Sequence, residues 1–92
     1  MRFDWDDNKA RSNATKYKVS FEEAATVWTD PLALIAPDPK HSTSESREWI
    51  IGTSYRQRLL VVVYTVRGET TRIISARTAT RNERKRYEEE SY

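Results

Sequence analysis

The chain has 92 residues, one histidine, no cysteine and a formal net charge of +2 at neutral pH. This length predicts one domain, residues 1–92, with a modest core. The absence of cysteine excludes disulfides and thiolate chemistry, and one histidine makes a dedicated zinc site unfavourable, so no metal or cofactor is expected. The longest apolar run, six residues at 59–64, is too short to span a membrane. The acidic, polar start does not have the form of a signal peptide, and we expect a cytoplasmic protein.

The first third of the chain predicts a short strand and two helices. The alternating sequence FDW at 3–5 predicts an edge strand, after which Asp6 or Asp7 caps a helix that reaches about residue 18. SFEE at 20–23 has the form of a capping box, in which Ser20 caps the second helix and Glu23 reaches back to it. Apolar residues at 21, 24, 25 and 28 share one face of this helix, and DP at 30–31 ends it.

The middle of the chain predicts a sheet. Apolar segments at 32–36, 48–54, 59–66 and 71–76, joined by polar or glycine-containing turns, predict an antiparallel meander. The segment 59–66 is apolar on both faces, which indicates a central strand covered on each side. Since the two helices should cover one face of this sheet, the fold class is expected to be α+β.

A third helix is predicted at about 81–90, where Thr80 and Glu83 form a second capping box. Tyr87 is its only large apolar candidate, and the three glutamates at 88–90 oppose the helix dipole. Three base-to-acid pairs at i, i+4 spacing, from residues 84–86 to 88–90, have the weaker orientation. We therefore expect this helix to be loosely held or to dock fully against a partner.

Basic residues are concentrated near the end of the chain. Residues 56–86 carry nine basic and two acidic side chains. Such a block attracts phosphates without regard to sequence, although a solvated charged surface is an equal alternative. Within it, Arg77 follows the last strand, and Arg81 and Arg84 lie one turn apart on the last helix. A phosphate there would also meet free N–H groups at the helix start.

Five segments carry a resemblance to a known family: FDWDDNKARSN at 3–13, VSFEEAATVWTDPLAL at 19–34, DPKHS at 38–42, RLLVVVYT at 58–65 and RIISARTATRNERKRYE at 72–88. On these segments the chain resembles, almost from end to end, the BrnT-type toxins of bacterial type II toxin–antitoxin modules. The resemblance implies a compact RelE-like fold, with two N-terminal helices on a curved antiparallel sheet of about four to five strands and a C-terminal helix. It also implies a ribonuclease that arrests translation. A BrnA-like antitoxin would neutralise it in a heterotetramer that represses the operon, and operator DNA would be bound only through the antitoxin.

Metal-free RNA cleavage by the 2′-hydroxyl needs a base, an acid and a group that stabilises charge on the phosphate. A guanidinium fork suits the last role, and Arg77 and Arg81 are the leading candidates; the alternative is that Arg81 and Arg84 only pair with glutamates. Arg58 and Arg72 open the central and last strands. They would line one sheet edge if those strands are neighbours, and would otherwise be surface charges.

Proton transfer has weaker candidates. His41 has an unperturbed pKa near neutrality, and with Glu45 it could form an acid–base pair, although a solvated loop residue is the simpler reading. Lys9, Lys16 and Tyr87 are candidates for gripping RNA, with exposed helix positions as the preferred alternative for the lysines. Tyr64 and the three tryptophans are assigned to the core.

One segment departs from the family pattern. Lys16, Tyr17 and Lys18 stand where relatives usually have Lys-His-Gly. The missing glycine removes an easy left-handed helix end, and no base role can be assigned to position 17. The alternative function is therefore an inactive module that binds an antitoxin or nucleic acid. Sequence-specific DNA binding by this chain is disfavoured, because it has no recognition helix.

Overall fold

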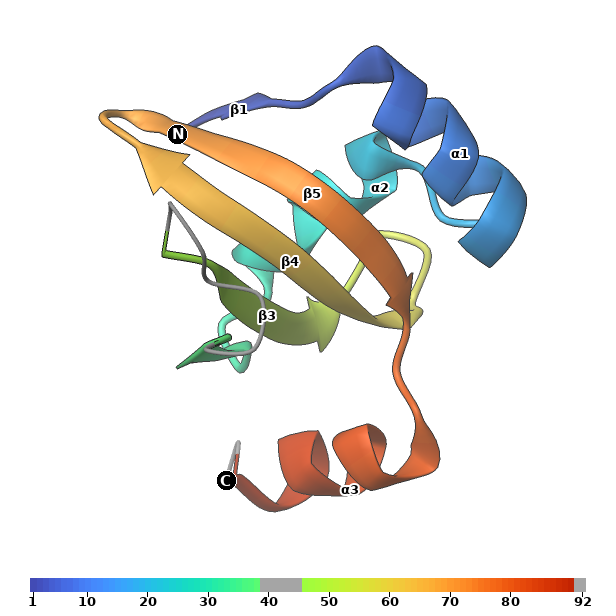
Figure 1. Ribbon diagram of the computed structural model, residues 1–92. Coiled ribbons are helices and arrows are strands. Elements are labelled where there is room, and N and C mark those ends of the chain that lie inside the picture. The colour runs from blue at the N-terminus through green and yellow to red at the C-terminus, as the bar shows by residue number, and fades with distance from the viewer. Residues whose placement is uncertain (39–45, 91–92) are drawn as a thin grey trace.

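The structure is a computed structural model that describes residues 1–38 and 46–90. Its sheet has the strand order β1-β5-β4-β3-β2. The strands are β1 (Arg2–Asp4), β2 (Leu34–Pro37), β3 (Glu48–Thr53), β4 (Leu59–Arg67) and β5 (Thr70–Thr78). The helices are α1 (Asp7–Tyr17), α2 (Phe21–Ala25) with the 3-10 turn η1 (Thr26–Thr29), and α3 (Arg81–Glu90). Figure 1 shows a twisted sheet with α3 well separated from α1 and α2.

The α+β expectation and the order of elements are confirmed, with one difference in strand direction. β1 pairs with β5 in parallel, Phe3 opposite Thr71, whereas the other three pairings are antiparallel. The sheet is therefore mixed, and the expectation of a purely antiparallel sheet is wrong for this strand. A three-residue strand at the start of the chain reaches the edge beside the last strand, and its alternating pattern carries no information on direction.

The larger core lies between the sheet and the two N-terminal helices, as expected. Its fully buried members come from α2, η1, the three central strands and the connection between α1 and α2. They include Val19, Phe21, Val27, Ile50, Leu60, Val62 and Ile73. Trp28 packs edge-on against Tyr64 at 4.9 Å between ring centroids. Burial, together with the neighbouring Glu48, raises the pKa of Tyr64 to about 12, so this phenol stays protonated at neutral pH. The assignment of Tyr64 to the core is confirmed.

The opposite face of the sheet carries a smaller core. Ile51, Leu59 and Val61 are buried there, with Trp49, Ala79 and Tyr87 packed against them. No residue of α3 is itself buried, so the helix covers this face only in part. β4 is covered on both faces, as its apolar sequence predicts. None of the helices in the described residues has the length and apolarity that a membrane span requires.

α1 is fixed to β5 by one buried side chain, Asn13. Its amide donates to the carbonyl of Ala76 at 2.8 Å and accepts from the Ala76 N–H at 3.0 Å. It also donates to the carbonyl of Val19, just beyond the helix end. Lys18 ends the helix in the left-handed conformation, with φ 61°, so a lysine occupies the backbone position that suits glycine.

Candidate functional site

A groove of about 320 Å³ lies on the second face of the sheet, between the strands and the start of α3. Its apolar floor comes from β3 and β4, and its polar rim comes from β5, α3 and the segment after β2. The lining residues are Asp38, Trp49, Val61, Val63, Ser75, Arg77 and Glu83. The groove therefore combines an aromatic ring, an arginine and carboxylates on one face.

Arg77 is the basic residue of this groove, and its guanidinium is held by Glu83. Nη1 and Nη2 donate to the two carboxylate oxygens at 2.7 and 2.8 Å. Nη1 also donates to the carbonyl of Thr78 at 3.3 Å. The other fork of the guanidinium, formed by Nε–H and the second N–H of Nη2, has no partner among the described residues. This fork matches the geometry of two phosphate oxygens.

Glu83 serves two structural purposes at once. It accepts the backbone N–H of Thr80 at 2.8 Å, while the Thr80 hydroxyl accepts the N–H of Glu83 at 3.2 Å, so the predicted capping box is confirmed. The hydrogen bonds from Arg77 lower the pKa of Glu83 to about 2. The same pairing raises the pKa of Arg77. Both groups are therefore charged at neutral pH, and Glu83 orients Arg77 rather than competing for a proton.

Other basic residues of α3 are exposed, or pair along the helix. Arg81 and Arg84 are exposed on the helix. The backbone N–H groups of Arg81 and Asn82 have no acceptor within the helix, because its first hydrogen bond runs from the Arg84 N–H to the Thr80 carbonyl. The Arg86 guanidinium lies 5.4 Å from the ring centre of Trp49 and pairs with Glu90 at 2.8 Å. This is the one pair of the three expected along α3 that forms among the described residues.

Arg58 lies on the other side of the sheet from Arg77. Its guanidinium donates to both carboxylate oxygens of Glu23, through Nη2 and through Nε at 2.9 Å, and to the carbonyl of Lys18 at 3.0 Å. Glu23 is only 2% exposed and also accepts from Ser54 at 2.6 Å. The capping-box expectation is therefore half wrong here. Ser20 caps Glu23 as predicted, but the carboxylate points inward to Arg58 instead of back to Ser20.

Arg72 does not share a sheet edge with Arg58. The two strands are neighbours, but they are antiparallel, so Arg72 lies opposite Thr65 while the start of β4 lies beside Thr78. Arg72 pairs with Asp4 at 3.3 Å across the β1–β5 boundary. The conditional expectation of a common edge is wrong, because antiparallel neighbours begin at opposite ends.

The other candidates fall into three places. Lys9 and Lys16 line a second groove beside β5. Tyr87 donates its hydroxyl proton to Asp30 at 2.7 Å, and so anchors α3. His41 and Glu45 lie outside the described residues.

Trp49 and Tyr17 line grooves of the structure, although the sequence does not mark them as site residues. Trp49 packs against the smaller core, but its ring also forms the floor of the groove. The alternation of Trp49 with the buried Ile50 is the signal, since adjacent strand residues face opposite ways. For Tyr17 the sequence indicates an apolar position of the first helix and the loss of the histidine usual in relatives, whereas the structure places it in the groove beside β5.

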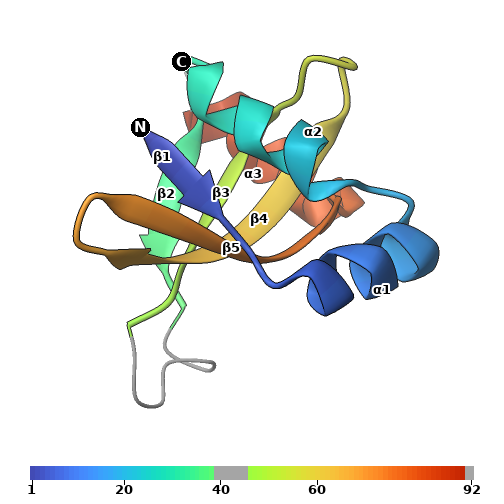
Figure 2. The ribbon, with the colours of Figure 1, turned by 90° about the horizontal axis from the view of Figure 1, so that it is seen from above.

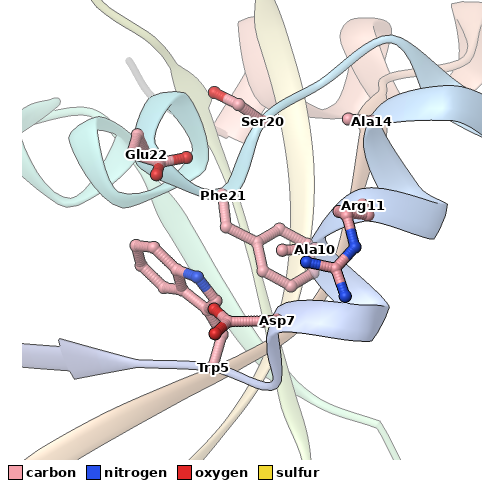
Figure 3. Close-up of a pocket in the computed structure, with 8 residues that line it drawn as sticks. All are labelled: Trp5, Asp7, Ala10, Arg11, Ala14, Ser20, Phe21 and Glu22. Carbon is pink, nitrogen blue, oxygen red and sulfur yellow. The ribbon is translucent and has the colours of Figure 1, made fainter.

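A further pocket of about 290 Å³ lies between α1 and α2. Figure 3 shows its aromatic part, formed by Trp5 and Phe21, and the carboxylates of Asp7 and Glu22 around it. Two carboxylates against one guanidinium, Arg11, make this pocket unfavourable for a phosphate. Among the described residues, no group of histidine and carboxylate side chains is close enough to hold a metal ion.

Comparisons with known proteins agree with the fold described above. A family model described as "Ribonuclease toxin, BrnT, of type II toxin-antitoxin system" matches residues 5–83. The crystal structure of the Brucella abortus ribonuclease toxin BrnT superposes with a TM-score of 0.68 and 23% sequence identity, covering 88% of this chain and 99% of that one. A search of curated protein sequences gave no match.

Proposed function

The chain belongs to the BrnT family of ribonuclease toxins of type II toxin–antitoxin systems, and we propose that it is a metal-independent endoribonuclease that inhibits translation. The observation that carries this proposal is the arrangement of Arg77 at the open groove. One fork of its guanidinium is held by Glu83, and the other is unpaired among the described residues. A guanidinium fixed in advance stabilises developing negative charge more effectively than a mobile one.

The proposed reaction is attack by the ribose 2′-oxygen on the adjacent phosphorus. The bond to the 5′-oxygen breaks, and the products are a 2′,3′-cyclic phosphate and a 5′-hydroxyl end. Arg77 would bind two phosphate oxygens, and Arg81 and the N–H groups at the start of α3 would add positive potential beside it. The proposal rests on Arg77 and Arg81 rather than on Arg58, whose guanidinium is occupied by Glu23.

We propose that His41 and Glu45 transfer the protons in this reaction. Glu83 is a poor base, because a pKa of about 2 lies far from neutral pH. A histidine with its ordinary pKa is matched to proton transfer near neutrality. We therefore expect His41→Ala to lower the cleavage rate by about 10²-fold or more.

Family membership implies an antitoxin partner. We propose that this partner is a BrnA-like protein, that toxin and antitoxin form a heterotetramer in the bacterial cytoplasm, and that operator DNA is bound through the antitoxin. The exposed basic residues of α3 and the groove beside them offer a surface that such a partner would cover.

Incubation of the purified protein with unstructured RNA in the presence of a chelator tests the enzymatic proposal. We expect 5′-hydroxyl and 2′,3′-cyclic phosphate ends, and arrest of growth on expression of the active protein. Arg77→Ala should lower the cleavage rate by about 10²-fold or more. Arg77→Lys should recover little, because an ammonium does not reproduce the fork. Arg2→Ala removes an exposed arginine of β1, far from Arg77 in the sequence, and should leave the cleavage rate unchanged. Absence of cleavage by a folded sample would instead favour the non-catalytic binding module.

A further inference from the structure

A groove of about 200 Å³ runs along the seam where α1 lies beside β5. Figures 1 and 2 both show α1 next to the C-terminal half of this strand. The groove is lined by Lys9, Ser12, Asn13, Lys16, Tyr17 and Ile74. The five residues from α1 follow helical spacing, so they share one face of the helix. Lys9 and Lys16 are seven residues apart, about 10 Å along the helix axis.

Asn13 sets the position of this face relative to Arg77. Its amide is bonded to both backbone groups of Ala76, and Arg77 is the next residue of β5. Tyr17 follows Asn13 by four residues, so it lies one turn further along α1 on the same face. The electrostatic effect of Tyr17 on the pKa of Arg77 agrees with this proximity. The seam therefore reaches the strand position next to Arg77, whose side chain points to the other face of the sheet.

The Tyr17 ring is exposed and lies beside a cation. The side chain is 37% exposed, and Nζ of Lys16 lies 5.1 Å from the ring centre. An exposed aromatic ring in a groove that also carries lysines is an arrangement by which proteins hold single-stranded nucleic acid, because the ring stacks on a base and the cations contact flanking phosphates.

The two flanks of α1 differ in charge. The flank toward α2 carries the carboxylates shown in Figure 3, Asp7 on α1 and Glu22 opposite it. The flank toward β5 has two lysines, and no carboxylate is among the described residues that line its groove. A polyanion is therefore attracted to the seam and repelled from the opposite flank.

We propose that the seam is a subsite for single-stranded RNA adjoining the phosphate bound at Arg77, with Tyr17 stacking on a base and Lys9 and Lys16 contacting backbone phosphates. This inference rests on the proposed function, and it extends the substrate path from the sheet face onto α1. The subsite gives Tyr17 a part in RNA binding in this chain.

Binding of a fluorescent ten-nucleotide 2′-O-methyl RNA, followed by anisotropy, tests the subsite. This probe lacks the attacking hydroxyl, so binding is measured without cleavage. Tyr17→Ala should weaken binding by about 5- to 100-fold, whereas Tyr17→Phe, which keeps the ring, should bind nearly as the unmodified protein does. Tyr55→Ala removes another exposed tyrosine, in the turn between β3 and β4, and should have no effect.

The lysines are tested through the salt dependence of the same binding. Lys16→Gln should reduce the slope of log affinity against log salt by about 0.7, the value for one phosphate contact on a single strand. Arg2→Gln removes the same charge from the distant edge strand and should leave the slope unchanged. Unaltered binding by Tyr17→Ala, or an equal loss with Tyr17→Phe, would overturn the subsite.

The two proposals fail separately. If the protein does not cleave RNA but its binding to the probe depends on Tyr17, the subsite stands and the enzymatic proposal falls. If cleavage depends on Arg77 but binding is insensitive to Tyr17 and Lys16, the enzymatic proposal stands and the subsite falls. Circular dichroism of each variant verifies that the fold is retained.

Discussion

The hydroxyl of Tyr87 donates a 2.7 Å hydrogen bond to Oδ2 of Asp30, and this contact joins α3 to the turn before β2. Asp30 also accepts the backbone N–H groups of Thr53 at 2.8 Å and Leu32 at 2.9 Å. Burial alone would raise the pKa of Asp30, but these hydrogen bonds outweigh it and the pKa lies below its ordinary value. Because α3 has no buried residue, such polar contacts carry much of its attachment.

Tyr87→Phe should loosen α3 without unfolding the sheet. The lost hydrogen bond contributes about 1 kcal/mol to docking of the helix. We expect faster trypsin cleavage after residues 84–86, measured by mass spectrometry over time. Tyr55→Phe is the matched control and should cleave at the original rate. Equal rates in both variants would show that the Asp30 contact does not hold the helix.

Acid should weaken the attachment of α3 through Glu83. Its pKa is depressed to about 2 in the folded protein, so the stabilisation is complete above the unfolded value near 4.5 and is lost as the pH falls toward 2. The Arg77 side chain is 40% exposed, and solvent screening limits the effect to about 1 kcal/mol. Urea unfolding at pH 7 and pH 3 should show a smaller pH-dependent difference in Glu83→Gln than in the unmodified protein.

Glu90→Gln removes a carboxylate from the exposed pair with Arg86 and is the control for that measurement. Its pH dependence should match that of the unmodified protein. If Glu83→Gln kept the full pH dependence, the acid sensitivity would have to arise from other carboxylates.

Glu23→Ala should be strongly destabilising. The substitution leaves Arg58 without its carboxylate partner and removes the acceptor of the buried Ser54 hydroxyl. Loss of one member of a buried ion pair costs about 3–5 kcal/mol, and the partial exposure of Arg58 places the expected loss near the lower value. Glu22→Ala, at the exposed neighbouring position, should change the free energy of unfolding by less than about 0.5 kcal/mol. Comparable losses in the two variants would contradict a special role for the Glu23 pair.

Lys18→Gly should stabilise the protein. The lysine is held at φ 61°, a conformation that glycine adopts without a Cβ penalty, so we expect a gain of about 1 kcal/mol. Lys16→Gly, inside the last turn of α1, should instead cost about 1 kcal/mol. The urea midpoints of the two variants should move in opposite directions. A lower midpoint for Lys18→Gly would mean that the backbone of this lysine is not strained.

The helices and strands were predicted well, because capping residues and apolar patterns lie within the segments that they define. The capping residues Ser20 and Thr80 begin α2 and α3 where expected, and the apolar run at 59–66 became the central strand. The direction of β1 was not predictable, since strand direction depends on which strand it meets. The partner of Glu23 was missed for a similar reason, because Arg58 approaches from 35 residues away in the sequence.

The candidate site was predictable only in part. The position of Arg77 near the end of the last strand and before a capped helix was evident from the sequence, although β5 runs on to Thr78 and therefore includes Arg77. Its pairing with Glu83 depends on how the intervening turn folds, and the proximity of Tyr17 depends on the packing of α1. Arg58 and Arg72 show most clearly what the sequence could not predict. Their strands are neighbours, as supposed, but the strands are antiparallel, so the two arginines lie at opposite ends of the pair.

The bond between Asn13 and Ala76 also bears on the behaviour of the protein at high concentration. β1 pairs with β5 only as far as Arg72, so the rest of that strand would present an open backbone edge. Asn13 occupies both backbone groups of Ala76 from this side, and α1 covers the strand around it. An incoming strand from another molecule therefore finds no continuous row of donors and acceptors, and β5 is protected against the edge-to-edge pairing that begins aggregation.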